Sequence, residues 1–365
     1  MNIILRHDDQ WLRFSDPVEI LTARSPEEIV PCFEKMQQSG LWAAGWIAYE
    51  AASALDDALV TCAPNKSFPL LQFGLFSHGE TLSHLIRPQT NYQLGGWTPS
   101  VTQDEYKDAI TRIKEHIAAG ETYQVNYTFR LQAPFCPDPL AFFHDLIAAQ
   151  QGRYSAWIQT EDFTICSASP ELFFERNNGV ITSKPMKGTR ARAVTTVADR
   201  EVAASLNDSP KDRAENIMIV DMIRNDIGRI ALTGSVKTIR QFDVEKYPTV
   251  WQLTSTVQGT VSPDSAQKIS PVMRALFPCA SITGAPKAKT MQIIRNLERS
   301  PRGIYTGAIG TISPDGQAQF NVAIRTAIIQ NGQVEYGIGG GIVWDSNPDS
   351  EYQEALSKAA ILTKQ

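Results

Sequence analysis

The stretch LFFERNNGVITSK, residues 172–184, decides the fold class. Its Asn178-Gly179 pair lies between two strand-like runs, and such pairs are typical of tight β-hairpin turns because both residues tolerate positive φ. Further strand-like runs occupy residues 122–133 and 153–169. Because these runs follow one another instead of alternating strictly with helices, the sequence favours an α+β fold with antiparallel sheets over a doubly wound fold.

Helical patterns separate these strand groups. The clearest is residues 102–120, where Thr102 and Glu105 form a capping-box pattern and Gly120 ends the apolar stripe. We expect further helices over 210–231, from about 284 with Pro286 in the first turn, and from about Pro348 onward.

A Gly/Pro/Ser-rich stretch, QLGGWTPS at residues 93–100, marks a candidate domain boundary. The residues before it read as short strands and loops with few helices. The sequence therefore predicts an N-terminal subdomain of residues 1–95, packed on a main domain of residues 100–365.

Composition excludes several classes of protein. The chain of 365 residues has 34 basic and 39 acidic side chains and a net charge of −5, so we expect no binding to nucleic acid or to an acidic membrane surface. No run is long and apolar enough for a signal peptide or a membrane span. Five cysteines without a C-x-x-C pair fit reduced thiols. We therefore expect a cytoplasmic protein.

The distribution of histidine limits the chemistry. All five histidines lie within the first 144 residues, so a site in the rest of the chain has no imidazole for nucleophilic catalysis or for zinc. Lysine, carboxylates and a metal bound through oxygen remain.

Two predicted helices each carry an acidic pair at i, i+3 spacing, which places both carboxylates on one helix face. The pairs are Asp212 with Glu215 and Glu351 with Glu354. Each pair alone is typical of a solvated charged face. Together they could form an oxygen-rich Mg²⁺ site that a substrate anion completes.

Two cations and a glycine run each allow two interpretations. Lys187, in PMKGTRAR (185–192), is either a basic-loop residue or an amine in a dry pocket that becomes nucleophilic. We expect Arg325 inside a strand, either at a sheet edge or directed into a cleft to bind a carboxylate. The glycines of YGIGGGIV (336–343) form either a bulged strand end or a loop that lets a ligand approach the main chain.

The chain resembles the chorismate-utilising enzymes. The resemblance runs from about residue 100 to the C-terminus through segments that follow the family's order: GETYQVNYT, SPELFFE, PMKGTRAR, KDRAENIMIVDMIRNDIGR, SITGAPKAKTM, RGIYTGAIG, IRTAII and GGGIVWDSNPDSEYQEALSK. The first 95 residues match more loosely, mainly through GWIAYEAASALDDAL. Within the family, the chain is most similar to the aminodeoxychorismate synthases.

The resemblance implies a fold and an activity. The fold would be the family's four-layer α/β/β/α architecture, with two large antiparallel sheets face to face, and residues 100–365 would be the chorismate-binding catalytic domain. The activity would convert chorismate and ammonia into 4-amino-4-deoxychorismate, in 4-aminobenzoate and folate biosynthesis. It would require Mg²⁺ and ammonia from a separate glutamine amidotransferase subunit.

The resemblance also implies roles for individual residues. Lys187 would attack ring carbon 2, and Glu171 would act as general acid and base for the departing hydroxyl. Glu215 and Glu354 would bind Mg²⁺ directly, with Asp212 and Glu351 in support. The implied substrate contacts are Gly188, Thr189, Thr283, Tyr305, Arg325, Gly339, Gly340, Gly341 and Lys358.

Two positions discriminate among relatives, and a third departs from many of them. Gln124 stands where members that add water to the ring carry a lysine base, which disfavours isochorismate and salicylate synthesis. Lys187 stands where anthranilate synthases carry alanine. Gln252 replaces a histidine that many relatives use in losing pyruvate, so ring aromatisation is disfavoured.

Two alternatives remain open. One is an anthranilate synthase, which belongs to the same family. The other is a non-catalytic protein that holds an anionic metabolite with a basic cluster: Lys184, Lys187, Arg190 and Arg192.

Overall fold

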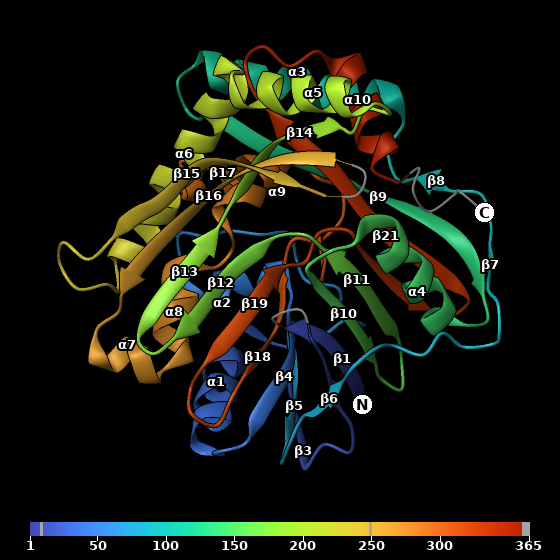
Figure 1. The fold of residues 1–365 in the computed structure, drawn as a ribbon, viewed down its shortest axis with the longest axis vertical. Helices are drawn as coiled ribbons and strands as arrows, with labels where there is room; N and C mark the ends of the chain where they lie inside the picture. The colour runs from blue at the N-terminus through green and yellow to red at the C-terminus, as the bar shows by residue number, and fades with distance from the viewer. Residues whose placement is uncertain (8–9, 248–249, 360–365) are drawn as a thin grey trace.

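The computed structural model describes residues 1–7, 10–247 and 250–359, and its strands form two large sheets (Figure 1). The first sheet has eleven strands. In order they are β17 (Gly284–Ala285), β9 (Gln124–Cys136), β21 (Gln333–Ile342), β20 (Thr326–Gln330), β11 (Thr164–Ser169), β10 (Tyr154–Gln159), β1 (Asn2–His7), β2 (Gln10–Phe14) and β6 (Glu80–Leu82), with β7 (Gln93–Leu94) and β8 (Thr98–Pro99) paired to β9.

The second sheet has ten strands. In order they are β14 (Met186–Ala191), β16 (Val250–Thr260), β13 (Val180–Lys184), β12 (Leu172–Asn177), β19 (Ala318–Val322), β18 (Ala308–Ile312), β4 (Trp42–Ile47), β5 (Leu71–Phe76) and β3 (Glu19–Ala23), with β15 (Lys237–Lys246) paired to β16. Neighbouring strands run antiparallel in both sheets, as β9 does with β21 and β12 with β13.

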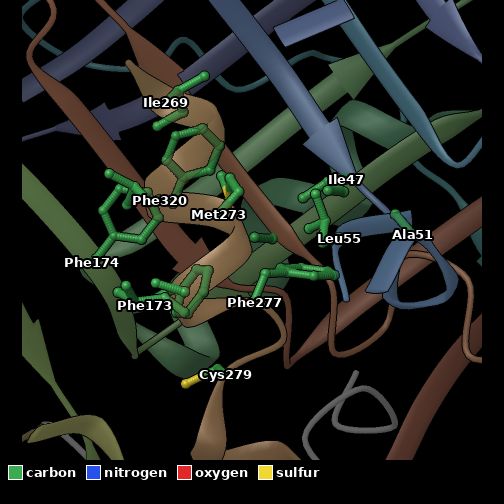
Figure 2. Close-up of a cluster of buried hydrophobic side chains, with 14 of the residues drawn as sticks. Ile47, Ala51, Leu55, Phe173, Phe174, Ile269, Met273, Phe277, Cys279 and Phe320 are labelled. Atoms are coloured by element: carbon green, nitrogen blue, oxygen red, sulfur yellow. The ribbon is translucent and has the colours of Figure 1, made fainter. Parts of the chain in front are cut away.

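Helices cover the outer face of each sheet. The helices α1 (Ile29–Gln38), α6 (Pro210–Gly228) and α8 (Ile269–Leu276) pack their apolar sides on the second sheet. Figure 2 shows part of this cluster, in which Met273 and Phe277 lie beside Phe173, Phe174 and Phe320. The helices α3 (Gln103–Ala118), α4 (Pro139–Gln150) and α10 (Pro348–Ser357) pack on the first sheet.

The remaining helices pack against these layers. They are α5 (Thr196–Asn207), α9 (Lys287–Leu297), the short α2 (Ala52–Leu55) and α7 (Pro263–Gln267), and the 3₁₀ turns η1 (Pro26–Glu28), η2 (Tyr49–Ala51) and η3 (Ala280–Ile282). None of the helices in the described ranges combines the length and apolar character that crossing a membrane requires.

A third apolar cluster lies between the sheets and includes Phe14, Trp46, Phe76, Ile158 and Ile309. With a core on each outer face and one between the sheets, the layers are helix, sheet, sheet and helix. The predicted α+β class and four-layer architecture are therefore confirmed.

The hairpin predicted from residues 172–184 is confirmed. Asn178 and Gly179 both adopt positive φ, 49° and 75°, between β12 and β13. Asn177 pairs with Val180, so these two residues form the whole turn.

The predicted helices form with small changes at their ends. In the predicted capping box of α3, the Thr102 hydroxyl accepts a hydrogen bond from the Glu105 N–H, and the Glu105 carboxylate accepts one from the Thr102 N–H. One detail was wrong: Pro286 is the residue before α9 and not part of its first turn.

Two further predictions were wrong. Arg325 is not inside a strand, because residues 323–325 link β19 of the second sheet to β20 of the first, and Arg325 has a φ of 53°. The glycine run is neither a loop nor a bulge, because Gly337 to Gly341 form part of β21 and pair one for one with β9.

Residues 1–95 contribute to both sheets: β1, β2, β6 and β7 join the first, and β3, β4 and β5 join the second. Strands from residues 1–95 and strands from the rest of the chain therefore belong to the same two sheets. The division near residues 95–100 remains a prediction.

Candidate active site

Lys187 lies in β14, at a break in the ladder between β14 and β16. The register shifts between Met186 and Thr189, and Gly188 has a φ of 86°. The half-buried Lys187 donates a hydrogen bond from Nζ to the carbonyl of Ser281 over 3.3 Å. Lys187 is therefore a strand residue directed at η3 and not part of a basic loop.

Glu171 lies close to Lys187 and is only 3% exposed. Burial raises the pKa of its carboxyl to about 7, while the Ser281 hydroxyl and the Lys187 charge oppose the shift. Its Oε1 has no hydrogen-bond partner among the described residues. A carboxyl with a pKa near neutrality and a vacant oxygen suits proton transfer at pH 7.

Gln124 is fully buried, and neither its Nε2 nor its Oε1 has a partner in the part of the chain that the structure describes. A Cβ atom added to Gly341 would lie 2.6 Å from Gln124 Nε2 and 3.5 Å from Lys187 Nζ. Gln124, Lys187 and Gly341 therefore converge on one point. Because an unpaired buried amide is costly, a bound polar molecule is the natural partner for Gln124.

The glycines of β21 form one wall of this site. The pairing of β20 with β21 ends at Tyr336, whereas the pairing with β9 continues to Ile342. One edge of residues 337–342 is thus free of strand pairing within the described ranges. Gly340 and Gly341 are half-buried and carry no side chain, so a ligand can approach their main chain closely.

The helix α10 places Glu351 and Lys358 beside these glycines. A Cβ atom on Gly340 would lie 3.4 Å from Glu351 Oε2 and 3.6 Å from Lys358 Nζ. Lys358 Nζ donates to the Gly339 carbonyl at 2.8 Å and pairs with Glu354 at 3.1 Å. Burial lowers the pKa of Lys358, and the Glu354 charge opposes this.

The helix α6 supplies the other acidic pair. Asp212 forms an ion pair of 2.6 Å with Arg190 and lies against Gly188. Burial raises the pKa of Glu215; the Lys187 charge opposes the shift, and the Glu351 charge adds to it. Glu215 therefore lies within electrostatic reach of both β14 and α10.

These carboxylates fit Mg²⁺ only as a partial ligand set. No group of three or more acidic, histidine or cysteine side chains in the described residues is close enough to hold a metal ion. Mg²⁺ commonly takes one or two protein carboxylates and completes its shell with substrate oxygens and water. Glu215 and the acidic residues of α10 suit that role.

Tyr305 and Arg325 lie near the same wall. The Tyr305 ring packs on Gly337 and under the Arg130 guanidinium, 5.1 Å from the ring centre. Burial raises the pKa of Tyr305 to about 12, opposed by nearby arginines. Arg325 donates from Nη1 to the Lys358 carbonyl at 2.8 Å, at the crossing between the sheets.

Two predicted substrate contacts use their hydroxyls within the protein. Thr283 is fully buried, and its hydroxyl donates to the carbonyls of Cys279 and Ala280. The exposed Thr189 donates to the Gln252 side chain at 3.1 Å. Their roles toward a substrate remain predictions.

Sequence reasoning missed Ser281. Its carbonyl contacts Lys187 and its hydroxyl contacts Glu171, so it links the two residues with predicted chemistry. The only signal in the sequence for Ser281 was its place in the segment SITGAPKAKTM. The residues around it do not indicate that η3 contacts β14.

Sequence reasoning gave Arg192 a role only in the basic cluster of the non-catalytic alternative. It forms an ion pair with Asp199 at the start of α5 and lies over the Trp251 ring at 5.0 Å. Arg192 therefore fastens α5 to the far end of the strand that carries Lys187.

Comparisons with known proteins show the family to which the chain belongs. The fold is shared with the crystal structure of anthranilate synthase component I from Streptococcus pneumoniae, which has a TM-score of 0.81, 24% sequence identity and coverage of 100% of this chain and 90% of that one. The family model for chorismate binding enzymes matches residues 3–364. The chain therefore belongs to the chorismate binding enzyme family.

Curated relatives include aminodeoxychorismate synthases and anthranilate synthases. Aminodeoxychorismate synthase component 1 of Salmonella typhimurium is 42% identical over 262 residues, which is 72% of this chain and 57% of the relative. The Bacillus subtilis protein of the same name is 37% identical, over 77% of this chain and 59% of the relative. An anthranilate synthase component 1 of Haloarcula marismortui is 39% identical, over 72% and 53%. The match thus spans less than two thirds of each of these relatives.

Proposed function

We propose that this protein is the chorismate-aminating component of an aminodeoxychorismate synthase, which converts chorismate and ammonia into 4-amino-4-deoxychorismate. The observation that carries the proposal is the convergence of Lys187, Glu171 and Gln124 beside the open edge of β21. Relatives that carry this name, 37% and 42% identical, support it.

The proposed chemistry proceeds in two balanced steps. Neutral Lys187 Nζ bonds to ring carbon 2, the two conjugated ring double bonds each shift by one position toward carbon 4, and the carbon-4 hydroxyl leaves as water with a proton from Glu171. Ammonia then bonds to carbon 4, both double bonds shift back, and the bond between carbon 2 and Lys187 breaks, which returns the lysine as a neutral amine. The Glu171 carboxylate recovers the proton that ammonia releases.

The raised pKa of Glu171 supports this role. With a pKa of about 7, a substantial fraction of the carboxyl is protonated at neutral pH and can donate to a leaving hydroxyl. Its contact with the Ser281 hydroxyl orients it, and Ser281 also holds Lys187. The two groups therefore stay in fixed relation.

Substrate binding is assigned to the wall that the glycines of β21 form. The main chain of Gly339 and Gly341, with Lys358, Arg325 and Tyr305, would bind the carboxylate groups of chorismate. Mg²⁺ would neutralise a substrate carboxylate. Glu215 and Glu354 would bind the ion, with Asp212 and Glu351 in support. It would bind together with the substrate because the protein offers an incomplete ligand set.

Ammonia would come from a glutamine amidotransferase subunit in the cytoplasm. The name of the relatives, component 1, implies a second component in those proteins. The proposal therefore assigns glutamine hydrolysis to a separate partner.

A product assay tests the proposal against anthranilate synthesis. Purified protein is incubated with chorismate, Mg²⁺ and an ammonium salt, and the products are separated. The proposal expects a non-aromatic amine that an added aminodeoxychorismate lyase converts to 4-aminobenzoate. Accumulation of anthranilate and pyruvate would refute it.

A second assay tests the non-catalytic alternative. If the basic cluster only holds an anionic metabolite, Lys187→Ala should weaken binding through lost charge, and the wild-type protein should form no product. The enzymatic proposal expects turnover by the wild type and its loss in the variant, with chorismate binding largely kept.

A further inference from the structure

The region before residue 95 contributes one buried carboxylate, Glu50, to a polar network beside the site. Glu50, in η2, is 3% exposed, and its Oε1 and Oε2 accept hydrogen bonds from the N–H groups of Arg302 (2.6 Å) and Gly303 (2.9 Å). The Tyr49 N–H donates to the Gly303 carbonyl at 2.9 Å. Three hydrogen bonds thus fix the turn at residues 302–303 to the region before residue 95.

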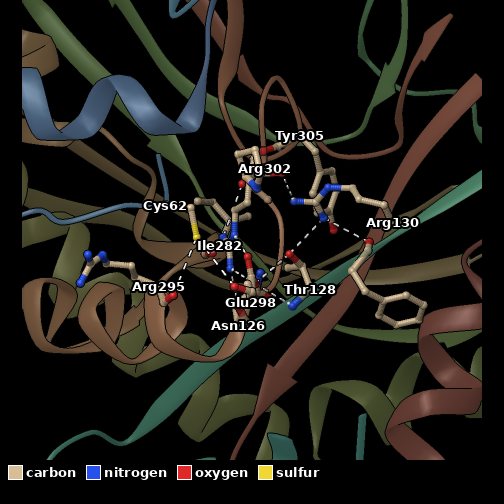
Figure 3. A network of polar contacts seen from close by, with 12 residues as sticks. Cys62, Asn126, Thr128, Arg130, Ile282, Arg295, Glu298, Arg302 and Tyr305 are labelled. Carbon is tan, nitrogen blue, oxygen red and sulfur yellow. Dashed lines mark hydrogen bonds and ion pairs between the residues drawn. The ribbon is translucent and has the colours of Figure 1, made fainter. Parts of the chain in front are cut away.

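The side chain of Arg302 extends from this turn to two other segments of the site (Figure 3). Its guanidinium donates to the Ile282 carbonyl at 2.9 Å and to the Asn126 carbonyl at 2.7 Å. Asn126 is two residues from Gln124 in β9, and Ile282 follows the serine that holds Lys187. Arg302 therefore sets the spacing between β9 and η3.

Glu298 completes the network around Arg302. It accepts from Arg302 Nε at 2.9 Å and Nη2 at 2.7 Å, and the Thr128 N–H and hydroxyl donate to its Oε1. The Thr128 hydroxyl accepts in turn from Arg130, whose guanidinium covers the Tyr305 ring (Figure 3). The turn that Glu50 holds leads to Tyr305 three residues after Arg302.

We propose that Glu50 is a positioning residue for the substrate-binding wall, acting through Arg302 on the segments that carry Gln124, Ser281 and Tyr305. The proposal rests on the proposed function, since it takes these segments as the chorismate site. It goes beyond that function by making the N-terminal region part of the site, although none of the predicted site residues lies before residue 124.

Substitution of Glu50 tests the proposal. Glu50→Gln keeps the size of the side chain but weakens the acceptor for one of the two N–H groups. The expected result is a rise of about tenfold in the chorismate KM and in the Kd measured by calorimetry, with kcat within about twofold of wild type, because only binding shared by ground and transition states is lost. The matched control is Glu34→Gln, an exposed carboxylate of α1 in the same region, which should change neither constant.

The outcome that overturns the proposal is a Glu50→Gln protein with a lower Tm but an unchanged KM and Kd, because Glu50 would then stabilise only the fold. If Glu50→Gln does not fold, Tm, KM and Kd are measured for Glu50→Asp instead. This variant keeps the charge but moves the acceptor away from the two N–H groups, and the same criterion applies to it. The test is separate from the proposed function. If the wild type forms anthranilate, the proposed function fails, while the effect of Glu50 on chorismate binding still decides this inference.

Discussion

Ser281 joins Lys187 to Glu171: its carbonyl accepts a hydrogen bond from the Lys187 amine at 3.3 Å, and its hydroxyl contacts the Glu171 carboxyl. One residue of η3 therefore fixes both groups to which the proposed mechanism gives covalent and proton-transfer roles. These contacts bring together residues that lie 94 positions apart in the chain.

Lys187→Ala should lower kcat about a thousandfold or more, because the covalent step loses its nucleophile. Chorismate Kd, measured by calorimetry with Mg²⁺ present, should change by less than about fivefold, since Lys187 is one of several cations near the site. The control is Lys237→Ala, an exposed lysine of β15 in the same sheet. Full activity of the Lys187 variant would exclude the nucleophile role.

Glu171→Gln should lower kcat by about 10²- to 10⁴-fold with little change in KM, the usual cost of losing a general acid. The variant should also lose the ionisation near pH 7 from its pH–rate profile, since Gln does not titrate. Rates are measured with saturating ammonium across pH 5.5–9. If the variant keeps the wild-type pH–rate profile, the ionisation near pH 7 belongs to a group other than Glu171.

Stability should fall as pH rises from about 5 to about 8. Glu171 and Glu50 both have a folded-state pKa raised from 4.5 to about 7 by burial. Between these values the folded state holds more protons than the unfolded state, so raising the pH favours unfolding. Across this pH window, deprotonation of each carboxyl lowers the free energy of unfolding by on the order of 3 kcal/mol. Thermal unfolding at a series of pH values should show a shallower fall for Glu171→Gln, and an unchanged slope would contradict this assignment.

Gly341→Ala should impair binding because the new Cβ would lie 2.6 Å from Gln124 Nε2. Overpacking of this kind costs about 1–3 kcal/mol, and here it displaces Gln124. We expect a higher chorismate KM, partly restored by adding Gln124→Ala. The control is Gly96→Ala, where an added Cβ meets nothing within 4 Å. Equal KM values for both glycine variants would rule out the convergence of Gln124 and Gly341 as a binding feature.

Glu215→Gln should raise the Mg²⁺ concentration for half-maximal activity by about tenfold, since a neutral amide is a weaker ligand for a hard cation. Removing Mg²⁺ with a chelator should abolish wild-type activity, and added Mg²⁺ should restore it. Glu201→Gln, an exposed residue of α5, serves as the control. An unchanged Mg²⁺ requirement in the Glu215 variant would remove that residue from the ligand set.

Local signals in the sequence predicted local structure well. The Asn178-Gly179 turn and the Thr102–Glu105 capping box depend on residues at most three apart, so their chemistry is visible in a short window. The fold class followed from the spacing of such elements. The family resemblance then supplied the number and arrangement of the layers.

Contacts between distant segments could not be read in this way. Arg325 looked like a strand residue because its neighbours are apolar, but those neighbours are buried at a crossing between sheets. The Arg302–Glu298 pair has ordinary i, i+4 spacing, yet it is fully buried because β9, η2 and η3 surround it. Only the assembled fold reveals that environment.

The half-paired glycine strand has a consequence for how the protein can move. Residues 337–342 are fixed in register to β9, so this wall of the site cannot shift without breaking the ladder between β9 and β21. Exposed strand edges invite association with other chains, and here α10 packs against β21 while Lys358 bonds to the Gly339 carbonyl. A ligand at this edge would occupy the place where the next strand would lie. Lys187, Glu215 and Glu351 would meet it from β14, α6 and α10, which lie outside the ladder between β9 and β21.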